Sequence, residues 1–476
     1  MKILMVSSES NPYAKTGGLA DVVYSLAKEL TIEGHEMTIV LPYYQAIAQI
    51  NNGSMKLIGA FDVYMSWRKQ HADLYRTYHE GITYYFIGNG YYFNRDNVYG
   101  YYDDIERFAF FTLAVRNMLK FVKLKPDIIH IHDWQAGMLP VIIKEQNKDD
   151  PFYSAIHFVT TIHNPAFQGL FDPFLLGDFY GLSDELYRSG KVRFKGATSS
   201  LKAAIMYSDK ITTVSPTHAK ELLTEEGGHG LNHVLQYVRD DFVGILNGID
   251  YEEWNPQTDG ALYKQYGYSD HIIGKRYNKE QLLLALGLEK TDGPLFGLVS
   301  RLTWQKGVDL LIASASSIVE QGGSLIVLGS GEANAEMEFN RLQERFPNRV
   351  FARIGYDNEL AHRLYGASDI FLMPSLFEPC GIAQMISLRY GTLPLVRATG
   401  GLKDTVIGYD GSNGEFANGF SFDDYTVSAL KDTITWAMQT FNDQPLREKL
   451  IYNAFKSQND WAQSARLYEQ LYKSIE

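Results

Sequence analysis

The residues KTGGL at positions 15–19 lie between a segment with the pattern of a buried strand and one with the pattern of an amphipathic helix. Residues 3–7 form an apolar run of strand length, and residues 20–30 carry apolar side chains three and four positions apart. The two glycines therefore occupy a strand-to-helix turn. Such a turn suits an anion, because glycine allows close approach, the first helical N–H groups lack partners and the helix dipole favours negative charge there. The preceding lysine adds a positive charge, so we predict a phosphate or polar sugar at this turn.

Tight packing alone is the other explanation for these glycines, since many strand-to-helix turns carry glycine for that reason. The spacing of a dinucleotide-binding turn is absent, because Gly17 and Gly18 are adjacent and Val22 and Val23 stand where a third glycine is wanted. The phosphate-loop spacing is absent too, since no Gly-Lys-Ser or Gly-Lys-Thr follows a glycine by four residues. The turn therefore indicates an anion or sugar without naming a nucleotide.

Composition narrows the class of protein. The chain has 476 residues, which favours two or three domains. Its formal net charge is -12 and no dense Lys/Arg block is visible, so we expect neither a nucleic-acid partner nor a membrane surface. No signal peptide is visible and no stretch approaches the roughly 18 apolar residues of a spanning helix, so we expect a cytoplasmic protein. Cys380 is the single cysteine, which excludes an internal disulfide and fits a reducing compartment.

Strand-like and helix-like segments alternate in the first half, which predicts crossover connections and a mainly parallel sheet covered on both faces. The predicted strands are residues 3–7, 36–43, 127–132, 157–162, 211–214 and 242–246, and the predicted helices are 20–30, 135–144 and 201–207. Between residues 56 and 86 the pattern changes to period two, which indicates an antiparallel extension of the sheet. The tyrosine-rich residues 88–104 show little periodicity, and we expect a loop there.

A second alternating series follows a linker, which we expect over residues 248–267 because of their turn signals, before a helix near 279–286. The predicted strands of this series are residues 295–300, 324–328, 349–354, 369–373 and 393–396. We therefore predict an α/β protein with two Rossmann-like, doubly wound parallel-sheet domains facing a cleft. The expected parts are an N-terminal domain over 1–247, a C-terminal domain over 248–458, and a helix within 459–476 that packs back on the N-terminal domain.

Polar groups follow several predicted strands, at the edge where ligands bind in such sheets. Arg301 and Lys306 follow the first strand of the second series, and Glu378 follows the fourth. Asp133 and His163 follow two strands of the first half. Each alone also has a structural explanation: the cations as solvated residues at a helix start, the aspartate as an N-cap and the histidine as a satisfied core residue. Their joint placement favours a site.

Seven motifs carry these residues and several more glycines and aromatics. They are KTGGLADVV (15–23), HIHDWQAG (130–137), TIHNPAFQG (161–169), GILNGID (244–250), SRLTWQKG (300–307), FEPCG (377–381) and ATGGLKDTV (398–406). Together, in this order and over nearly the whole chain, they resemble bacterial glycogen synthase and plant starch synthase. The resemblance implies a glycosyltransferase-B fold. It also implies retaining transfer of glucose from ADP-glucose to the non-reducing end of an α-1,4-glucan such as glycogen, with release of ADP and with no metal or other cofactor.

The resemblance implies a set of site residues as well. The expected catalytic residues are Arg301, Lys306, Glu378, Asp133 and His163, and the expected substrate-binding residues are Lys15, Gly17, Gly18, Asp21, Asn164, Asn247, Tyr356, Cys380, Gly381, Gly400, Gly401, Tyr99 and Trp134. The cations Arg301 and Lys306 match the family's phosphate-binding pair, and positive charge there would stabilise the departing diphosphate. The glycine turns are expected to add backbone N–H groups.

The remaining predicted roles concern the two sugars and the adenine of the donor. Glu378 is expected to bind hydroxyls of the donor glucose, and Asp133 and His163 to orient hydroxyls at the donor sugar and the acceptor end. Asn164 and Asn247 are expected to contact the same region as these two, and Asp21 belongs to the same pattern. Tyr356 resembles the tyrosine that stacks on the adenine, with a simple strand-end tyrosine as the alternative. Tyr99 and Trp134 are candidate platforms for the acceptor.

Three positions in and after FEPCG carry further expectations. Ile386 stands where related enzymes with diverse donors often carry a second glutamate, which favours the glycogen synthase branch. Ala383 stands where the family commonly has threonine, and we expect the missing hydroxyl to slow transfer or loosen phosphate binding. Cys380 precedes a predicted helix, which is expected to lower the pKa of its thiol, although steric blocking is the expected basis of any inhibition by thiol reagents.

Other functions stay open at this point. A related retaining glycosyltransferase would use a UDP-sugar or a small acceptor, and a glucan-binding protein would lack turnover. A dinucleotide oxidoreductase would explain two α/β halves but lacks the glycine fingerprint. No second carboxylate is placed by motif as a nucleophile, so we expect attack on the same face, with the departing phosphate taking the acceptor's proton. The sequence predicts no particular oligomeric state.

Overall fold

The strand and helix expected around the KTGGL turn are both present in the computed structural model, which describes residues 1–51 and 53–475. β1 is Lys2–Val6, and its last four residues are buried. α1 is Gly18–Ile32, and it turns its apolar side chains to the core. These elements belong to the first of two units: unit 1 comprises Met1–Ile245 with the residues from Trp461 onward, and unit 2 comprises Leu246–Asp460.

Unit 1 contains a nine-stranded sheet in the order β12-β11-β7-β6-β1-β2-β5-β4-β3. Its further strands are β2 (Glu36–Pro42), β3 (Lys56–Met65), β4 (Arg68–His79), β5 (Ile82–Gly88), β6 (Ile128–His132), β7 (His157–Ile162), β11 (Lys210–Thr213) and β12 (Phe242–Gly244). The predicted antiparallel extension consists of β3 and β4, whereas β5 runs parallel to β2. A separate antiparallel sheet joins β8 (Leu170–Phe171), β10 (Ala197–Ser199) and β9 (Arg193–Phe194).

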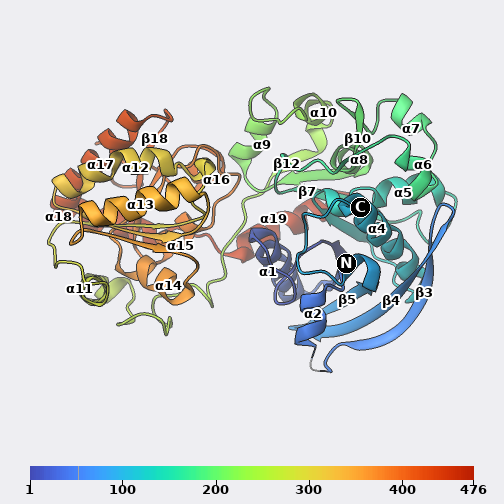
Figure 1. The fold of residues 1–476 in the computed structure, drawn as a ribbon, viewed down its shortest axis with the longest axis horizontal. Helices are drawn as coiled ribbons and strands as arrows, with labels where there is room; N and C mark the ends of the chain where they lie inside the picture. The colour runs from blue at the N-terminus through green and yellow to red at the C-terminus, as the bar shows by residue number, and fades with distance from the viewer. Residues whose placement is uncertain (52, 476) are drawn as a thin grey trace. The chain divides into compact units, whose positions relative to one another are not determined.

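The helices of unit 1 differ from the predictions at two places. They are α2 (Gln45–Ile50), α3 (Gly90–Phe93), α4 (Asp104–Phe121), η1 (Trp134–Ala136), α5 (Leu139–Gln146), α6 (Leu175–Tyr180), α7 (Glu185–Arg188), α8 (Ser200–Tyr207), α9 (Pro216–Leu222), α10 (Asn232–Tyr237), η2 (Arg239–Asp241) and α19 (Trp461–Lys473). The helix predicted over 135–144 is interrupted, and α5 begins near Pro140, which suits a first helical turn. The expected loop over 88–104 contains the short α3. α19 packs against α1 (Figure 1).

Unit 2 contains a six-stranded parallel sheet in the order β15-β14-β13-β16-β17-β18. The strands are β13 (Leu295–Val299), β14 (Ser324–Gly329), β15 (Val350–Ile354), β16 (Ile370–Met373), β17 (Leu393–Arg397) and β18 (Phe420–Phe422). The helices are η3 (Tyr268–Asp270), α11 (His271–Ala285), η4 (Trp304–Lys306), α12 (Val308–Glu320), α13 (Ala333–Arg345), α14 (Asn358–Ala367), α15 (Ala383–Arg389), α16 (Gly400–Thr405), α17 (Val427–Asn442) and α18 (Gln444–Lys456). Figure 1 shows α12, α13 and α17 on one face of the sheet and α11 and α14 on the other. Burial on both faces explains the nearly continuous apolar strands.

The segment expected to be a linker, residues 248–267, is part of unit 2. Tyr266 is buried there, and its hydroxyl donates to the carbonyl oxygen of Tyr390 at 2.8 Å. The helix predicted near 279–286 begins already at His271. Turn residues such as Asn255-Pro256 therefore mark bends in a packed segment and not a free connection. Over the described residues, no helix has the length and apolar character needed to cross a membrane.

Both large sheets reverse their strand order at one point. In unit 1 the reversal lies between β1 and β6, and in unit 2 it lies between β13 and β16. Counted in chain order, the central parallel strands of each sheet follow the 3-2-1-4-5-6 order of doubly wound folds. The prediction of two Rossmann-like parallel sheets is therefore confirmed. Ligands of such sheets bind beyond the carboxyl ends of the strands at the reversal, so in each unit we expect site residues in the loops after the two strands at its own reversal.

Candidate functional site

The loops after β13 and β16 surround a cavity of about 210 Å³ in unit 2. Its lining includes four residues predicted from the sequence and two others: Arg301, Lys306, Glu378 and Gly381, together with Ser375 and Ala383. The two cations come from the loop after β13, and the carboxylate comes from the loop after β16. The predicted residues Arg301, Lys306 and Glu378 thus line one cavity, and their roles stay predictions.

A short ion pair lies at this cavity. The Lys306 ammonium group donates to Glu378 Oε2 at 2.6 Å, and the Ser375 hydroxyl donates to the same oxygen at 3.1 Å. The side chains of Lys306 and Glu378 are only 17% and 9% exposed. The lysine thus compensates a carboxylate that water scarcely reaches. Arg301 is exposed, and its guanidinium group has no partner among residues 1–51 and 53–475, so its planar donors are available to an anion.

Glycines bring two loops of unit 2, those after β16 and β17, into backbone contact. Gly400 has φ +46°, and a Cβ atom there would lie 2.0 Å from the carbonyl oxygen of Glu378. A Cβ atom on Gly401 would lie 2.1 Å from the carbonyl oxygen of Cys380. The Gly401 amide donates to the Glu378 carbonyl oxygen at 3.2 Å. This amide is therefore used for packing, in contrast to the expectation that both glycines offer free N–H groups to a phosphate.

Two residues beside these loops differ from expectation. The predicted lowering of the Cys380 pKa is wrong: burial raises the pKa of its thiol to about 12. The physical reason is that α15 begins only at Ala383, while the thiol is buried and 6% exposed. Asn247, which we expected beside the site residues of the first half, belongs to unit 2, where its backbone hydrogen-bonds to Cys380.

Tyr356 lies in the loop after β15, at the same edge of the unit 2 sheet. Its side chain is 86% exposed, and its hydroxyl donates to Asn358 Oδ1 at 3.0 Å. The aromatic ring is therefore accessible to a flat partner. Stacking on an adenine stays a prediction, since Tyr356 is not part of the lining of the cavity described above.

In unit 1, the KTGGL turn already holds a carboxylate of the protein itself. Glu9, which follows β1, is only 3% exposed. Its side chain accepts hydrogen bonds from the backbone N–H of Thr16, from the Thr16 hydroxyl at 2.8 Å and from the backbone N–H of Gly17 at 3.3 Å. The group at these amides in the structure is the side-chain carboxyl group of Glu9, and a bound phosphate or sugar at this turn stays a prediction. The phosphate-binding role of Gly17 and Gly18 stays a prediction.

The lysine of this turn is also engaged. Lys15 Nζ lies 2.8 Å from Asp21 Oδ1, and the side-chain amide of Asn11 donates to the same oxygen. The Lys15 side chain is 53% exposed. An ion pair this exposed contributes little stability, so the lysine can exchange its partner for an incoming anion at small cost.

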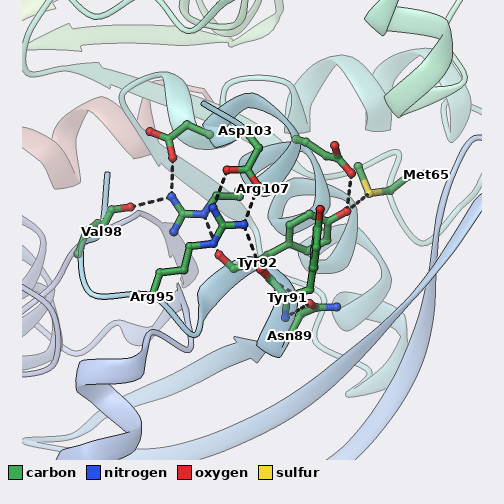
Figure 2. A network of polar contacts seen from close by, with 10 residues as sticks. Met65, Asn89, Tyr91, Tyr92, Arg95, Val98, Asp103 and Arg107 are labelled. Atoms are coloured by element: carbon green, nitrogen blue, oxygen red, sulfur yellow. Dashed lines mark hydrogen bonds and ion pairs between the residues drawn. The ribbon is translucent and has the colours of Figure 1, made fainter. Parts of the chain in front are cut away.

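Two arginines hold the tyrosine-rich loop after α3 (Figure 2). Arg107 of α4 is fully buried, and it donates to the carbonyl oxygens of Tyr92 at 2.8 Å and Val98 at 3.1 Å. Arg95 donates two hydrogen bonds of 2.6 Å to the carboxylate of Asp103. The loop therefore folds around two cations, which its lack of periodicity did not reveal.

This loop delivers Tyr99 to Glu9. The Tyr99 hydroxyl donates to Glu9 Oε1 at 2.7 Å and lies 2.6 Å from Ser8 Oγ. Burial is the largest cause that raises the pKa of this tyrosine above its ordinary value. Tyr99 thus braces the carboxylate that holds the KTGGL turn. Its predicted role as an acceptor platform is not tested by these contacts.

Asp133 lies after β6, at the reversal of the unit 1 sheet, with a positive φ of +57°. It does not cap the following helical turn with its side chain. Instead, Asp133 Oδ1 accepts from the backbone N–H of His163 at 2.8 Å and of Asn164 at 3.4 Å. Burial raises the pKa of the Asp133 carboxyl to about 7, although both backbone donors act in the opposite direction. The three predicted residues of this region are therefore neighbours.

Trp134 begins the turn η1 next to this group. Its ring meets the Phe108 ring edge-on at 5.2 Å, and a Cβ atom on Gly169 would lie 2.4 Å from its ring. The glycine, with φ +59°, therefore makes room for the indole. These contacts fix Trp134 within unit 1, and its role as an acceptor platform stays a prediction.

Comparison with known proteins identifies the family. The model of the starch synthase catalytic domain matches residues 2–237, and the model of glycosyl transferases group 1 matches residues 285–457. A glycogen synthase of Clostridium beijerinckii is 44% identical over 100% of this chain and 99% of its own length. One of Bacillus cereus is 42% identical over 100% of both chains. The chain belongs to the glycogen and starch synthase family.

Solved structures agree with this family. The catalytic domain of starch synthase IV from Arabidopsis thaliana, bound to ADP and acarbose, has a TM-score of 0.91 and 34% identity over 99% of each chain. Sucrose-phosphate synthase from Thermosynechococcus elongatus has a TM-score of 0.63 at 17% identity, which shows a shared fold. The predictions of a glycosyltransferase-B fold and of glycosyltransferase activity are confirmed.

Unit 2 of this glycosyltransferase has a second, larger cavity of about 460 Å³, near the residues that begin β16 and β17. It therefore lies at the amino-terminal edge of the sheet. Its buried ammonium groups are already bonded: Lys279 to Asp369 at 2.8 Å and Lys275 to Thr392 Oγ1 at 2.6 Å. We assign no ligand to it. Within the part of the chain that the structure describes, no group of three or more His, Cys, Asp or Glu residues could hold a metal ion.

Two buried residues that contact predicted site residues, Glu9 and His132, were not predicted from the motifs. Glu9 precedes KTGGL without standing at a spacing that predicts a contact. His132 lies on β6, and its Nδ1 is 3.0 Å from His163 Nε2. A signal was present in the second case, because His130 and His132 alternate along a strand that is otherwise apolar, and imidazoles inside a sheet need polar partners.

Proposed function

We propose that this chain transfers glucose from ADP-glucose to the non-reducing end of an α-1,4-glucan such as glycogen, with retention of configuration and release of ADP. The observation that carries the proposal is the group of Arg301, Lys306 and Glu378 around one cavity at the reversal of the unit 2 sheet. Family membership supports it, since the full-length bacterial relatives are glycogen synthases. The similar plant enzyme, bound to ADP and acarbose, supports it too.

The chemistry requires positive charge at the diphosphate. When the bond between glucose C1 and the phosphate oxygen breaks, negative charge develops on that oxygen, and cations held nearby lower the barrier. Arg301 offers planar donors that suit a phosphate, and Lys306 offers a point charge. The donor base would stack on the exposed ring of Tyr356. Neither a metal nor another cofactor is part of the proposal.

Glu378 and the residues of unit 1 would bind the sugars. Lys306 and Ser375 already bind one oxygen of the Glu378 carboxylate, so its position is fixed before a substrate arrives. We assign the second oxygen to hydroxyls of the donor glucose. Asp133, held by the backbone N–H groups of His163 and Asn164, would orient hydroxyls at the donor sugar and the acceptor end.

Retention would arise from attack on the face that the phosphate leaves. The acceptor hydroxyl oxygen bonds to glucose C1, the bond from C1 to the phosphate oxygen breaks, and the departing phosphate takes the acceptor's proton. Atoms and charges then balance without a covalent enzyme intermediate. Trapping a glucosyl ester on any aspartate or glutamate would contradict this route and favour a double displacement.

The test compares donors and acceptors directly. We expect release of ADP from ADP-glucose that depends on added glycogen, elongation of its chains, and much slower turnover of UDP-glucose. Faster turnover of UDP-glucose, or full turnover with a small acceptor and none with glycogen, would assign the chain to a different glycosyltransferase. Binding of glycogen without release of ADP would overturn catalysis altogether.

A further inference from the structure

Three histidines adjoin one another in the core of unit 1. His130 and His132 lie on β6, so their side chains share one face of the sheet, and His163 follows the adjacent strand β7. The His130 and His132 rings are 4.3 Å apart, and the His132 and His163 rings are 5.2 Å apart. The polar contact between the last two joins His132 Nδ1 and His163 Nε2 at 3.0 Å. His132 thus connects the core to a predicted site residue.

All three rings are neutral in the folded protein. Burial lowers the pKa of His130 and of His163 to about 3 and lowers that of His132 well below its ordinary value. Each ring then carries one proton, on either Nδ1 or Nε2. In the contact between His132 and His163, one nitrogen must donate and the other must accept.

The second nitrogen of His132 decides which one donates. His132 is fully buried, and its Nε2 has no hydrogen-bond partner among the described residues. A proton on Nε2 would leave a buried N–H without an acceptor, which is rarer in folded proteins than a bare acceptor. The proton therefore belongs on His132 Nδ1, which donates to His163 Nε2. The single proton of His163 is then on its Nδ1.

We infer that His132 is a positioning residue: its Nδ1–H group donates to His163 Nε2, and so holds the half-buried His163 ring as the Nδ1–H tautomer, a hydrogen-bond donor to a sugar hydroxyl. The inference rests on the proposed function for the identity of the sugar. It assigns His163 a donor role in orienting substrate and excludes it as a general base, because the only lone pair of its ring is already bound.

The neighbours of His132 hold this geometry. His130 Nδ1 lies 2.8 Å from the Tyr472 hydroxyl of α19, and its Nε2 lies 2.6 Å from Thr161 Oγ1. With both nitrogens engaged, the His130 ring has a fixed plane on which the His132 ring rests. The His163 backbone is held separately by Asp133 Oδ1 at 2.8 Å. Backbone and ring of His163 are therefore positioned by different residues.

Nuclear magnetic resonance of the full chain labelled with ¹⁵N-histidine tests the tautomer without substrate. Protonated and bare ring nitrogens differ in chemical shift and coupling pattern, and the His163→Asn variant identifies the signals of His163. We expect a protonated Nδ1 and a bare Nε2. A protonated Nε2 in the unaltered chain, or a His163 spectrum unchanged by His132→Phe, would overturn the inference. Failure of glucosyl transfer in the unaltered chain would instead refute the proposed function and leave this spectrum intact.

Kinetics supply the second readout. His132→Phe keeps a ring but removes the donor, and we expect kcat/KM to fall on the order of 10- to 100-fold. His132→Asn places an amide donor near the former Nδ1, and we expect it to recover much of the loss. The matched control is His218→Phe, which replaces another buried histidine of unit 1, on α9, whose ring contacts Glu221 and neither His132 nor His163, and we expect its kcat/KM within about threefold of the unaltered chain. Equal losses in the two phenylalanine variants would show a structural role and overturn the inference.

Discussion

The two sheets have the same strand order around their reversal points, but the loops there carry different charged side chains. In unit 1 the loops there carry Glu9 and Asp133, and the backbone N–H groups that face these carboxylates are already bonded to them. In unit 2 the loop after β13 carries the cations Arg301 and Lys306, and the loop after β16 carries Glu378, beside a cavity of about 210 Å³. Strand order thus fixes where a ligand binds, and the side chains decide its charge. A diphosphate suits the cationic edge of unit 2, and sugar hydroxyls suit the acidic, hydrogen-bonded edge of unit 1.

The largest effect should come from removing the cations of unit 2. We expect Arg301→Ala and Lys306→Ala each to lower kcat for glucosyl transfer by about 10²- to 10³-fold, because the departing diphosphate loses a stabilising charge. Steady-state release of ADP measures this. Arg341→Ala, which removes an exposed arginine of α13, is the control and should leave kcat unchanged. A double alanine variant of Arg301 and Lys306 with undiminished transfer would break the comparison between the two edges.

The second largest effect should be the difference in stability between glycine-to-alanine variants at the two sheet edges. A Cβ atom on Gly400 would lie 2.0 Å from a backbone carbonyl oxygen, whereas a Cβ atom on Gly17 would meet nothing within 4 Å. We expect Gly400→Ala to destabilise unit 2 by about 3 kcal/mol. Gly17→Ala should change stability by no more than about 0.5 kcal/mol. Thermal unfolding followed by calorimetry compares the two variants. Equal stability of both would show that the loops of unit 2 are less tightly packed than their backbone contacts imply.

The stability of unit 1 should depend on pH because of Asp133. The folded-state pKa of this carboxyl is raised to about 7, so its contribution to stability is complete below the ordinary value near 3.8 and is lost as pH rises towards 7. An asparagine side chain at this position cannot ionise. As pH rises from 4.5 to 7.5, we therefore expect the melting temperature of Asp133→Asn to rise relative to that of the unaltered chain. The free energy of unfolding of the unaltered chain should fall by about 1.4 kcal/mol for each pH unit below the folded-state pKa of Asp133. A difference independent of pH would mean that the carboxyl is ionised throughout.

The smallest effect concerns the cavity of unit 2. Ala383 lines it beside Lys306 and Glu378, and a hydroxyl there could donate to a phosphate oxygen. We expect Ala383→Thr to tighten ADP binding, or to raise kcat, by about three- to tenfold, since one added hydrogen bond contributes about 1 kcal/mol. Titration calorimetry with ADP and the kinetics of transfer measure the two outcomes. Ala383→Val, with similar volume and no hydroxyl, is the control and should not produce the gain.

The sequence predicted what strand patterns and strand ends determine. The apolar runs located the parallel strands of both sheets, and the residues after them included Arg301, Lys306 and Glu378. It could not predict contacts between distant segments. Glu9 accepts a hydrogen bond from Tyr99, which lies on a loop held in place by Arg107 of α4. No local spacing in the sequence predicts such a contact. The predicted lowering of the Cys380 pKa was wrong for a related reason: burial by other loops raises this pKa and outweighs the nearby helix start.

The chain enters and leaves unit 2 at adjoining points. The Ile249 amide donates to the Asn459 carbonyl oxygen at 2.8 Å, and Ile249 and Asp460 form a parallel bridge. Unit 2 is thus an insertion in the sequence of unit 1. Helix α19 of unit 1, whose Tyr472 contacts His130, is therefore synthesised after unit 2. On the ribosome unit 2 can fold as soon as it emerges, whereas unit 1, although begun first, closes its core last.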